Sequence, residues 1–264
     1  MTGAGARADA ADHLVRERRG AAEWLVLNRP ARRNALTVEL VRDLADAVAQ
    51  AGADPEVRAL VVTGAPPVFC AGGDLTALSA VAERGARAVT DAVYGQFQRL
   101  VRLLRDVPVP VLAAVNGPAL GAGLDLALAC DLRYASRTAS FASSWINAGL
   151  VPGMGGAHLL TRTVGSTRAN EMVLTGRAVP PDEAYAWGLV NEVLAPEQLE
   201  ERVTEVTGEL AKLSLAALSS SKASLRRALS SEFDHELAVL GAVQGGLLTG
   251  QEFRDAMARF RKKS

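Results

Sequence analysis

Cysteine and lysine are both scarce in this 264-residue chain. Its two cysteines, Cys70 and Cys130, each sit inside an apolar run, which favours reduced, buried thiols over a disulfide framework. Only four of the 29 basic residues are lysines, and arginine together with abundant alanine indicates a GC-rich genome rather than a phosphate-binding role. The composition therefore predicts a cytoplasmic protein without disulfides.

An excess of one charge and long apolar runs are missing as well. The 29 basic and 29 acidic residues give a formal net charge of zero, so bulk electrostatics favour neither nucleic acid nor an anionic membrane as a partner. No apolar stretch reaches membrane-spanning length, because Asn116, Asp125 and prolines interrupt the best one. The spacing of His, Cys and acidic residues matches no metal site. We therefore expect no metal and no separate cofactor.

The residues that are present predict a single large folded unit. A hydrophobic content of 49% is enough to bury a sizeable core. Residues 1–12 lack the apolar core of a signal peptide and are predicted to be disordered. Residues 13–195 alternate strand and helix patterns, whereas 196–264 are helical with breaks near 213–214, 230–231 and 250. The expected fold class is an α/β core with a helical C-terminal extension.

Hydrophobic periodicity predicts the elements of the core. A stripe that includes Val41, Leu44 and Val48 follows Thr37, which predicts a helix with Thr37 as its N-cap. Further helices are expected at 89–105, 156–164, 167–174 and 181–188. Strands are expected at 14–18, 24–28, 59–63, 109–115, 131–135 and 189–193, and residues 141–150 are expected to form a loop.

Two glycine-rich turns, each followed by an acidic residue, are the most informative motifs. They are Phe69–Asp74 (FCAGGD) and Asn116–Asp125 (NGPALGAGLD). Each follows a predicted buried strand and leads into a helix, so its backbone N–H groups have no side chain to shield them. The amides of Gly73 and Ala122 would form an oxyanion hole, which predicts carbonyl chemistry through an enolate. Either turn alone is equally consistent with an ordinary strand-to-helix connection.

Other motifs occur in a fixed order along nearly the whole chain. Besides the two turns they are Leu27-Asn28-Arg29-Pro30, Asn34-Ala35-Leu36, Ala114-Val115-Asn116-Gly117, Cys130-Asp131, Gly149-Leu150-Val151-Pro152, Leu174-Thr175-Gly176-Arg177 and Trp187-Gly188-Leu189-Val190-Asn191. With these motifs the chain resembles the crotonase, or enoyl-CoA hydratase/isomerase, family from about Leu25 to Lys263.

The resemblance implies both a fold and an activity. It implies a spiral of ββα units, with C-terminal helices at 196–264 that assemble a trimer or a dimer of trimers. It also implies an acyl-CoA substrate, usually an enoyl-CoA that is hydrated or isomerised, with its thioester oxygen held by the Gly73 and Ala122 amides. A glycine is commoner at the second of these positions, but alanine keeps the N–H.

The chain departs from the family at the catalytic acids. Hydratases of the family have two glutamates; here Asp125 stands at the first position and Trp145 at the second. An indole can only donate a hydrogen bond and cannot exchange a proton. The residues therefore give less support to hydration by two carboxylates. The Gly153-Met154-Gly155 stretch also excludes the aspartate nucleophile of other branches. Asp125 remains as the expected proton-transfer or water-orienting group, although it could simply bond a neighbouring backbone group or an arginine, and Trp145 is expected to shape the acyl pocket.

Two alternative activities stay open. The residues Asn147, Gly149, His158, Thr161 and Arg162 resemble the malonyl-type acyl-CoA decarboxylase branch. Decarboxylation needs a stabilised enolate and a desolvated carboxylate rather than a strong base. His158 could equally pack or cap within a helix. A relative that binds acyl-CoA without turning it over is the other alternative.

The resemblance also indicates where coenzyme A would bind. It points to Arg32, Arg33, Ala71, Asp74 and Lys263. Arginine pairs well with phosphate oxygens. Both arginines and the C-terminal basic residues could also be ordinary charged surface, and Asp74 could serve as the N-cap of the following helix.

Overall fold

The computed structural model describes the backbone of residues 13–228 and 230–263, and the side chains of 13–228 and 230–259. The disorder expected for residues 1–12 lies outside the described residues. The strands are β1 (Leu14–Arg19), β2 (Ala22–Leu27), β3 (Ala59–Gly64), β4 (Val111–Val115), β5 (Pro118–Leu120), β6 (Leu132–Ser136), β7 (Ser140–Ala142) and β8 (Glu192–Leu194). The α-helices are α1 (Val38–Ala53), α2 (Leu75–Ala82), α3 (Ala86–Ala88), α4 (Gly95–Asp106), α5 (Ala122–Ala129), α6 (Gly156–Thr175), α7 (Pro181–Ala186), α8 (Leu199–Ala211), α9 (Leu215–Arg227), α10 (Phe233–Leu248) and α11 (Gln251–Lys263).

A six-stranded sheet forms the centre of the fold. Its strand order is β1-β2-β3-β4-β6-β8, and only the β1–β2 hairpin is antiparallel. Parallel neighbours need crossover connections, and helices supply the longer ones, as the alternating pattern predicted. A second sheet pairs β5 with β7 in parallel. The α/β fold class and the hairpin at 14–28 are therefore confirmed.

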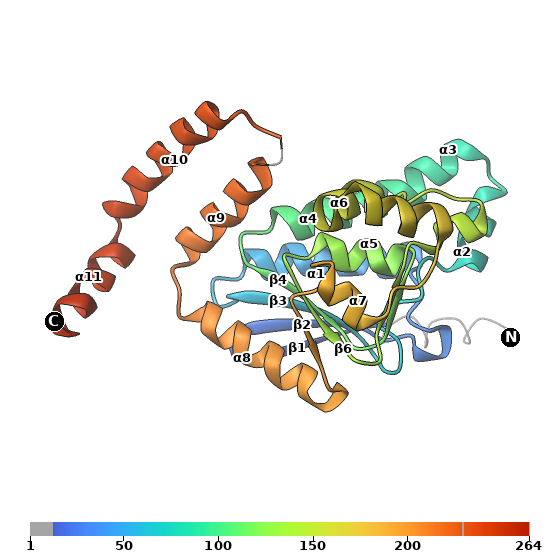
Figure 1. Cartoon of the computed structure of the whole chain (residues 1–264), viewed down its shortest axis with the longest axis horizontal. Helices are drawn as coiled ribbons and strands as arrows, with labels where there is room; N and C mark the ends of the chain where they lie inside the picture. Colours follow the sequence, from blue (N-terminus) through green and yellow to red (C-terminus); the bar gives the residue numbers. More distant parts are fainter. Residues whose placement is uncertain (1–12, 229, 264) are drawn as a thin grey trace, which may run out of the picture.

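Helices cover both faces of the large sheet (Figure 1). On one face α1 packs beside α4, and Thr37 caps α1 by accepting a hydrogen bond from the Leu40 amide at 3.2 Å. On the other face α8 buries Leu199 and Val203 against Trp24. Burial of these faces supplies the main driving force for folding. Although α8 begins the region expected to be a C-terminal extension, it covers a face of the core.

Four expectations differ from the structure. The strand expected at 189–193 begins later, because residues 189–191 form a bend and β8 starts at Glu192. Residues 141–150 do not form a plain loop, because they contain β7 and the 3₁₀ turn η3 (Ser144–Ala148). The two helices expected at 156–174 run together as α6, with a kink at Gly165, whose φ of 79° and ψ of 163° are not helical. The helix expected from residue 89 begins with a π-helical segment, η2 (Val89–Tyr94), before α4.

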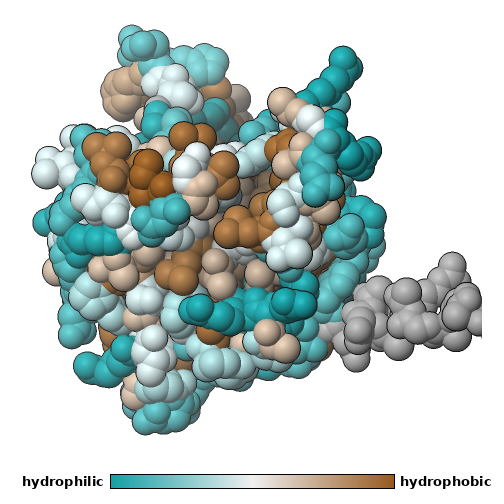
Figure 2. Space-filling view, turned by 90° about the vertical axis from the view of Figure 1, so that its right-hand side faces the viewer, coloured by the Kyte–Doolittle hydropathy of each residue, from teal (hydrophilic) through white to brown (hydrophobic). Residues whose placement is uncertain are grey.

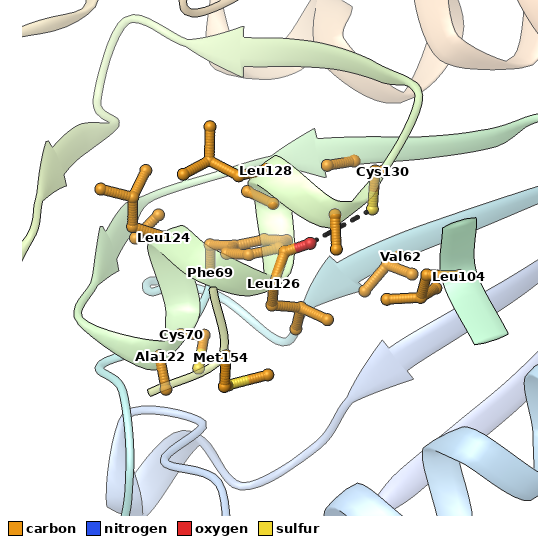
Figure 3. Packing of buried hydrophobic residues seen from close by; sticks show 14 of the residues in the cluster. Val62, Phe69, Cys70, Leu104, Ala122, Leu124, Leu126, Leu128, Cys130 and Met154 are labelled. Atoms are coloured by element: carbon orange, nitrogen blue, oxygen red, sulfur yellow. Dashed lines mark hydrogen bonds between the residues drawn. The ribbon is translucent and has the colours of Figure 1, made fainter. Parts of the chain in front are cut away.

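The core extends to the end of the sheet where the two glycine turns lie. Cys70, Ala122 and Met154 come together at one end of a buried cluster that also holds Phe69 and Leu124 (Figure 3). Burial raises the pKa of the Cys70 and Cys130 thiols to about 12, so both are protonated at neutral pH. The two buried, free thiols expected from the sequence are confirmed.

Helices α9, α10 and α11 extend away from the core as an arm (Figure 1). Lys222 attaches α9 to the core by donating to the carbonyls of Leu104 at 3.0 Å and Val109 at 3.1 Å. The expected helix breaks near 213–214, 230–231 and 250 are confirmed. In the part of the chain that the structure describes, no helix is long and apolar enough to cross a membrane.

Candidate active site

The first glycine turn is held by hydrogen bonds on both sides. On one side the Leu36 amide donates to the Gly72 carbonyl at 2.8 Å, and the Asp74 amide donates to the Leu36 carbonyl at 2.9 Å. On the other side the Cys70 amide donates to the Pro118 carbonyl at 3.1 Å, and the Leu120 amide donates to the Cys70 carbonyl at 2.9 Å. These short bridges fix the first turn against the second.

Two backbone N–H groups are left free where the turns meet. Among the described residues, neither the Gly73 amide nor the Ala122 amide donates a hydrogen bond to any protein group. Ala122 is the first residue of α5, and the first amides of a helix have no intrahelical acceptor. The partial positive charge at that helix end favours a negative oxygen.

A small cavity of about 80 Å³ lies between the turns. It is lined by Ala71, Gly72, Gly73, Leu75, Gly121, Ala122, Ser144, Trp145, Ala148 and Leu150. Apolar side chains around it are exposed, among them Leu75 at 59% and Val151 at 75%. Figure 2 shows that apolar residues gather on this side of the molecule. The cavity and its surroundings can therefore accept an apolar chain that carries one oxygen to be stabilised.

The close approach of the turns depends on glycine. Gly72 has a φ of 101°, and a Cβ there would lie 2.9 Å from the Leu120 carbonyl oxygen. Ala122, in contrast, is not among the residues with positive φ, because it has already entered the helix. Its methyl group therefore brings no backbone strain.

Gly123 is predicted to be irreplaceable even by alanine. A Cβ at this position would lie 2.3 Å from the Cys70 carbonyl oxygen and 2.8 Å from the Cys70 Cβ. We expect Gly123→Ala to push the two turns apart and to lower the free energy of unfolding by about 1–3 kcal/mol. Urea denaturation measures the change.

Gly208→Ala is the matched control for this change. Gly208 also lies within a helix, but an added Cβ would meet nothing within 4 Å there. Helix propensity alone should make that variant about 0.5–1 kcal/mol more stable. Equal effects of the two substitutions would contradict the proposed close contact between the turns.

Asp125 lies one helical turn after Ala122 and is fully buried. Burial raises the pKa of its carboxyl group to about 7; the Trp145 indole and the amides of Met154 and Gly156 are near enough to oppose that rise, but only in part. Among the described residues, no donor meets hydrogen-bond geometry at either carboxylate oxygen. A Cβ on Gly156 would lie 1.9 Å from one of these oxygens, so the backbone of this glycine covers the carboxylate directly.

Trp145 separates Asp125 from the cavity. Its ring lies beside Gly121, and its indole N–H has no partner in hydrogen-bond geometry within the described part of the chain. Trp145 lines the cavity, whereas Asp125 does not. The site thus holds one buried carboxyl group beneath an aromatic cover.

The structure brings together four of the five residues expected to contact coenzyme A. The exposed Arg32 and Arg33 lie next to the first turn, where the Ala71 amide donates to the Arg33 carbonyl at 3.0 Å. Asp74 caps α2 by accepting from the Ala77 amide at 3.2 Å and pairs with Arg29 at 3.1 Å. The side chain of Lys263 lies outside the described residues.

Three of the five residues of the decarboxylase-like run lie away from the cavity. His158, Thr161 and Arg162 lie on the exposed side of α6, where the His158 ring contacts the Arg162 guanidinium at 3.0 Å. None of the three lines the cavity.

Sequence reasoning missed two glycines of the site. Gly156 lies against Asp125, and a Cβ on Gly153 would lie 2.1 Å from the Tyr94 ring. In the sequence, Gly153-Met154-Gly155 indicates the lack of an acid, and Gly156 follows directly. The density of glycine in this run was the available signal for close backbone contacts.

Comparisons with known proteins agree with this geometry. Residues 18–264 match the family described as enoyl-CoA hydratase/isomerase. The chain is 32% identical over 254 residues to a crotonyl-CoA hydratase of Syntrophomonas wolfei, which covers 96% of each protein. It is 34% identical over 201 residues to a 4-chlorobenzoyl coenzyme A dehalogenase of Arthrobacter, covering 75% of this chain and 72% of that one.

A solved structure gives the same fold. The crystal structure of an enoyl-CoA hydratase from Bacillus anthracis superposes with a TM-score of 0.90 at 28% identity, covering 95% of this chain and 96% of that one. The chain therefore belongs to the enoyl-CoA hydratase/isomerase (crotonase) family and is an enzyme of that family acting on an acyl-CoA.

Proposed function

We propose that this enzyme isomerises the double bond of an enoyl-CoA through a thioester enolate. The observation that carries the proposal is the pair of unpartnered amides, Gly73 and Ala122, at one cavity beside a single buried carboxyl group. The amides would donate to the thioester oxygen as negative charge develops on it. Asp125 would transfer the proton.

Isomerisation needs only one acid–base group. The Asp125 carboxylate removes a proton from the carbon next to the thioester, and the charge moves onto the oxygen held by the two amides. The same carboxyl group then returns the proton two carbons further along the chain, so that no water is consumed. A carboxyl group with a pKa of about 7 accepts and returns a proton near neutral pH with little bias.

Hydration is less well supported by the residues present. It adds water across the double bond, and the family's hydratases use two acids for this step. Trp145 stands where the second acid would be, and an indole neither accepts nor releases a proton in this range. In our proposal the incoming acyl chain displaces the Trp145 ring from above Asp125. After this displacement the Trp145 ring still lines the acyl pocket, where it keeps water away from the enolate.

The test is the product formed from a panel of thioesters. Purified protein is incubated with 3-enoyl-CoA, 2-enoyl-CoA and malonyl-type thioesters, and the products are separated and weighed by mass spectrometry. We expect the 3-enoyl and 2-enoyl forms to interconvert with little 3-hydroxyacyl-CoA. A 3-hydroxyacyl product as the main one would overturn the proposal in favour of hydration.

Decarboxylation of a malonyl-type thioester is the second candidate. It is favoured by one observation: no ionisable side chain of the described residues lines the cavity. A carboxylate placed there would be desolvated, and its loss as CO₂ would need only the amides to hold the enolate. CO₂ release that survives loss of Asp125 would identify this reaction. Binding without turnover of any thioester would instead identify a non-catalytic relative.

We also propose a trimer or hexamer, with the coenzyme phosphates near Arg32 and Arg33. The assembly is supported by apolar side chains on the C-terminal arm that remain exposed in one chain, including Phe233 at 74% and Leu237 at 50%. A protein that sedimented as a monomer would contradict the assembly.

A further inference from the structure

A second cleft lies at the C-terminal end of α5, whereas the glycine turns lie at the N-terminal end of this helix. It has a volume of about 370 Å³ and is bounded by the ends of α4 and α5, by α6 and by α9. It shares no lining residue with the cavity between the turns. We call it the α9 cleft.

Positive charge dominates the lining of this cleft. Five basic residues line it, Arg105, Arg133, Arg162, Lys222 and Arg226, against one acidic residue, Asp131. A surplus of this size is unusual in a chain whose formal net charge is zero.

Three of the five cations are satisfied within the fold. Lys222 pairs with Asp131 at 2.7 Å, and Arg226 pairs with Asp106. The partly buried Arg133 guanidinium donates to three backbone carbonyls, those of Leu189 and Cys130 at 2.8 Å and of Ala127 at 3.5 Å.

Arg105 and Arg162 remain without a carboxylate. Among the described residues neither forms an ion pair, and the side-chain hydrogen bond of Arg162 is with the His158 ring. Burial lowers the pKa of Arg105, and the positive charges of Arg226 and Arg162 lower it further, whereas the carboxylates of Asp131 and Asp106 offset only part of this. The guanidinium groups of Arg105, Arg162 and Arg226 therefore repel one another, and an anion bound between them would reduce this repulsion.

The rest of the lining is apolar. Leu128, Leu159, Leu218 and Leu225 face the same space, and its volume falls in the range of small-molecule sites. An inorganic ion would leave this apolar surface exposed to water. A ligand with both an anionic head and an apolar body would satisfy both parts of the lining.

We propose that the α9 cleft binds an organic anion, a carboxylate or phosphate ester on an apolar body, through Arg105 and Arg162. Guanidinium groups recognise either head group through paired hydrogen bonds. The site is separate from the reacting thioester, so the proposal does not depend on which reaction the enzyme performs.

The test measures binding of matched probes to the full-length protein by isothermal titration calorimetry. Octanoate and octyl phosphate carry the two head groups, octanamide lacks the charge, and inorganic phosphate lacks the apolar body. We expect one site for at least one of the two octyl anions and none for octanamide at the same position. The stronger octyl anion identifies the preferred head group.

Variants assign that site. Arg105→Gln/Arg162→Gln should weaken the anion site about tenfold or more, because charge-assisted hydrogen bonds are lost. Arg42→Gln/Arg99→Gln, on the outer surfaces of α1 and α4, removes the same net charge away from the cleft and should leave binding unchanged. Equal affinity in both double variants, or equal binding of octanamide, would overturn the proposal.

A variant that adds a carboxylate tests the site even if the double arginine variant fails to fold. Ser221 lines the cleft on the exposed side of α9, so Ser221→Glu would place an anion beside the cations. We expect this variant to melt at a higher temperature and to lose the octyl-anion site. Retained binding of the octyl anion together with an unchanged or lower melting temperature would contradict the site.

Discussion

Replacing Ala122 with proline is expected to lower kcat by about 10²–10³-fold without unfolding the protein. Proline has no backbone N–H, so the variant removes one of the two donors that converge on the cavity. No side chain is lost that could explain the effect otherwise. The change tests the oxyanion hole at a single atom.

The backbone at this position should tolerate proline. Ala122 is the first residue of α5, and its backbone N–H takes part in no helical hydrogen bond. Proline, which lacks this N–H, therefore costs the helix no hydrogen bond there. Proline restricts the backbone of the residue before it through a clash with that residue's Cβ. Here that residue is Gly121, which has a φ of 52° and no Cβ. The melting temperature should therefore remain within a few degrees of the parent value.

Two further variants and a spectroscopic signal make the result specific. Ala122→Gly and Ala122→Ser keep the N–H and should retain activity within about tenfold. The infrared carbonyl band of a bound acyl-CoA should shift to lower frequency in the parent protein and shift less in Ala122→Pro, whatever the reaction is. Normal kcat and an undiminished band shift in the proline variant would exclude the Ala122 amide from the hole.

The parts of this site that the sequence predicts are those set by local pattern. The apolar run at 59–63 predicted the strand before the Gly73 turn, and Asp74 was expected to cap a helix after that turn, as it caps α2. Ala122 could be assigned to a helix start because an apolar strand and glycines precede it. Local conformational preference and burial act over a few residues, which a sequence pattern records.

The parts that escaped prediction depend on contacts between distant segments. The three-residue strand β7 exists because it pairs with β5, some 20 residues earlier, and so short a strand has no periodicity of its own. The burial of Asp125 depends on Gly156, 31 residues later, and on Trp145. Arg162 was assigned by resemblance to the reaction, but the exposed side of α6 carries it to the α9 cleft.

Asp125→Asn is expected to reduce isomerisation by about 10²–10⁴-fold, the usual contribution of a positioned acid–base group. Asparagine has nearly the same shape and fits the same space beneath Trp145, but it cannot accept and return the proton. The decisive comparison is with decarboxylation, which does not need this group. Full isomerase activity in the variant would remove Asp125 from the mechanism.

The pH dependence of activity and stability, compared between the parent enzyme and Asp125→Asn, gives a second, independent measurement. A base must be deprotonated, so kcat/KM of the parent enzyme should rise as the pH passes through about 7. Stability should move the other way. Because burial raises the pKa from 3.8 to about 7, the folded state keeps a proton that the unfolded state releases, and the free energy of unfolding falls as the pH rises between these values.

Asp125→Asn should abolish both trends. Its activity limb near pH 7 should vanish, and its unfolding free energy should lack the component of up to about 1.4 kcal/mol per pH unit that the carboxyl group contributes between about pH 4 and 7. A stability difference between parent and variant that stayed constant over this range would mean that the carboxylate is solvated when the protein is folded. The aromatic cover formed by Trp145 would then be open in solution, and the carboxyl group would have no raised pKa with which to return a proton at neutral pH.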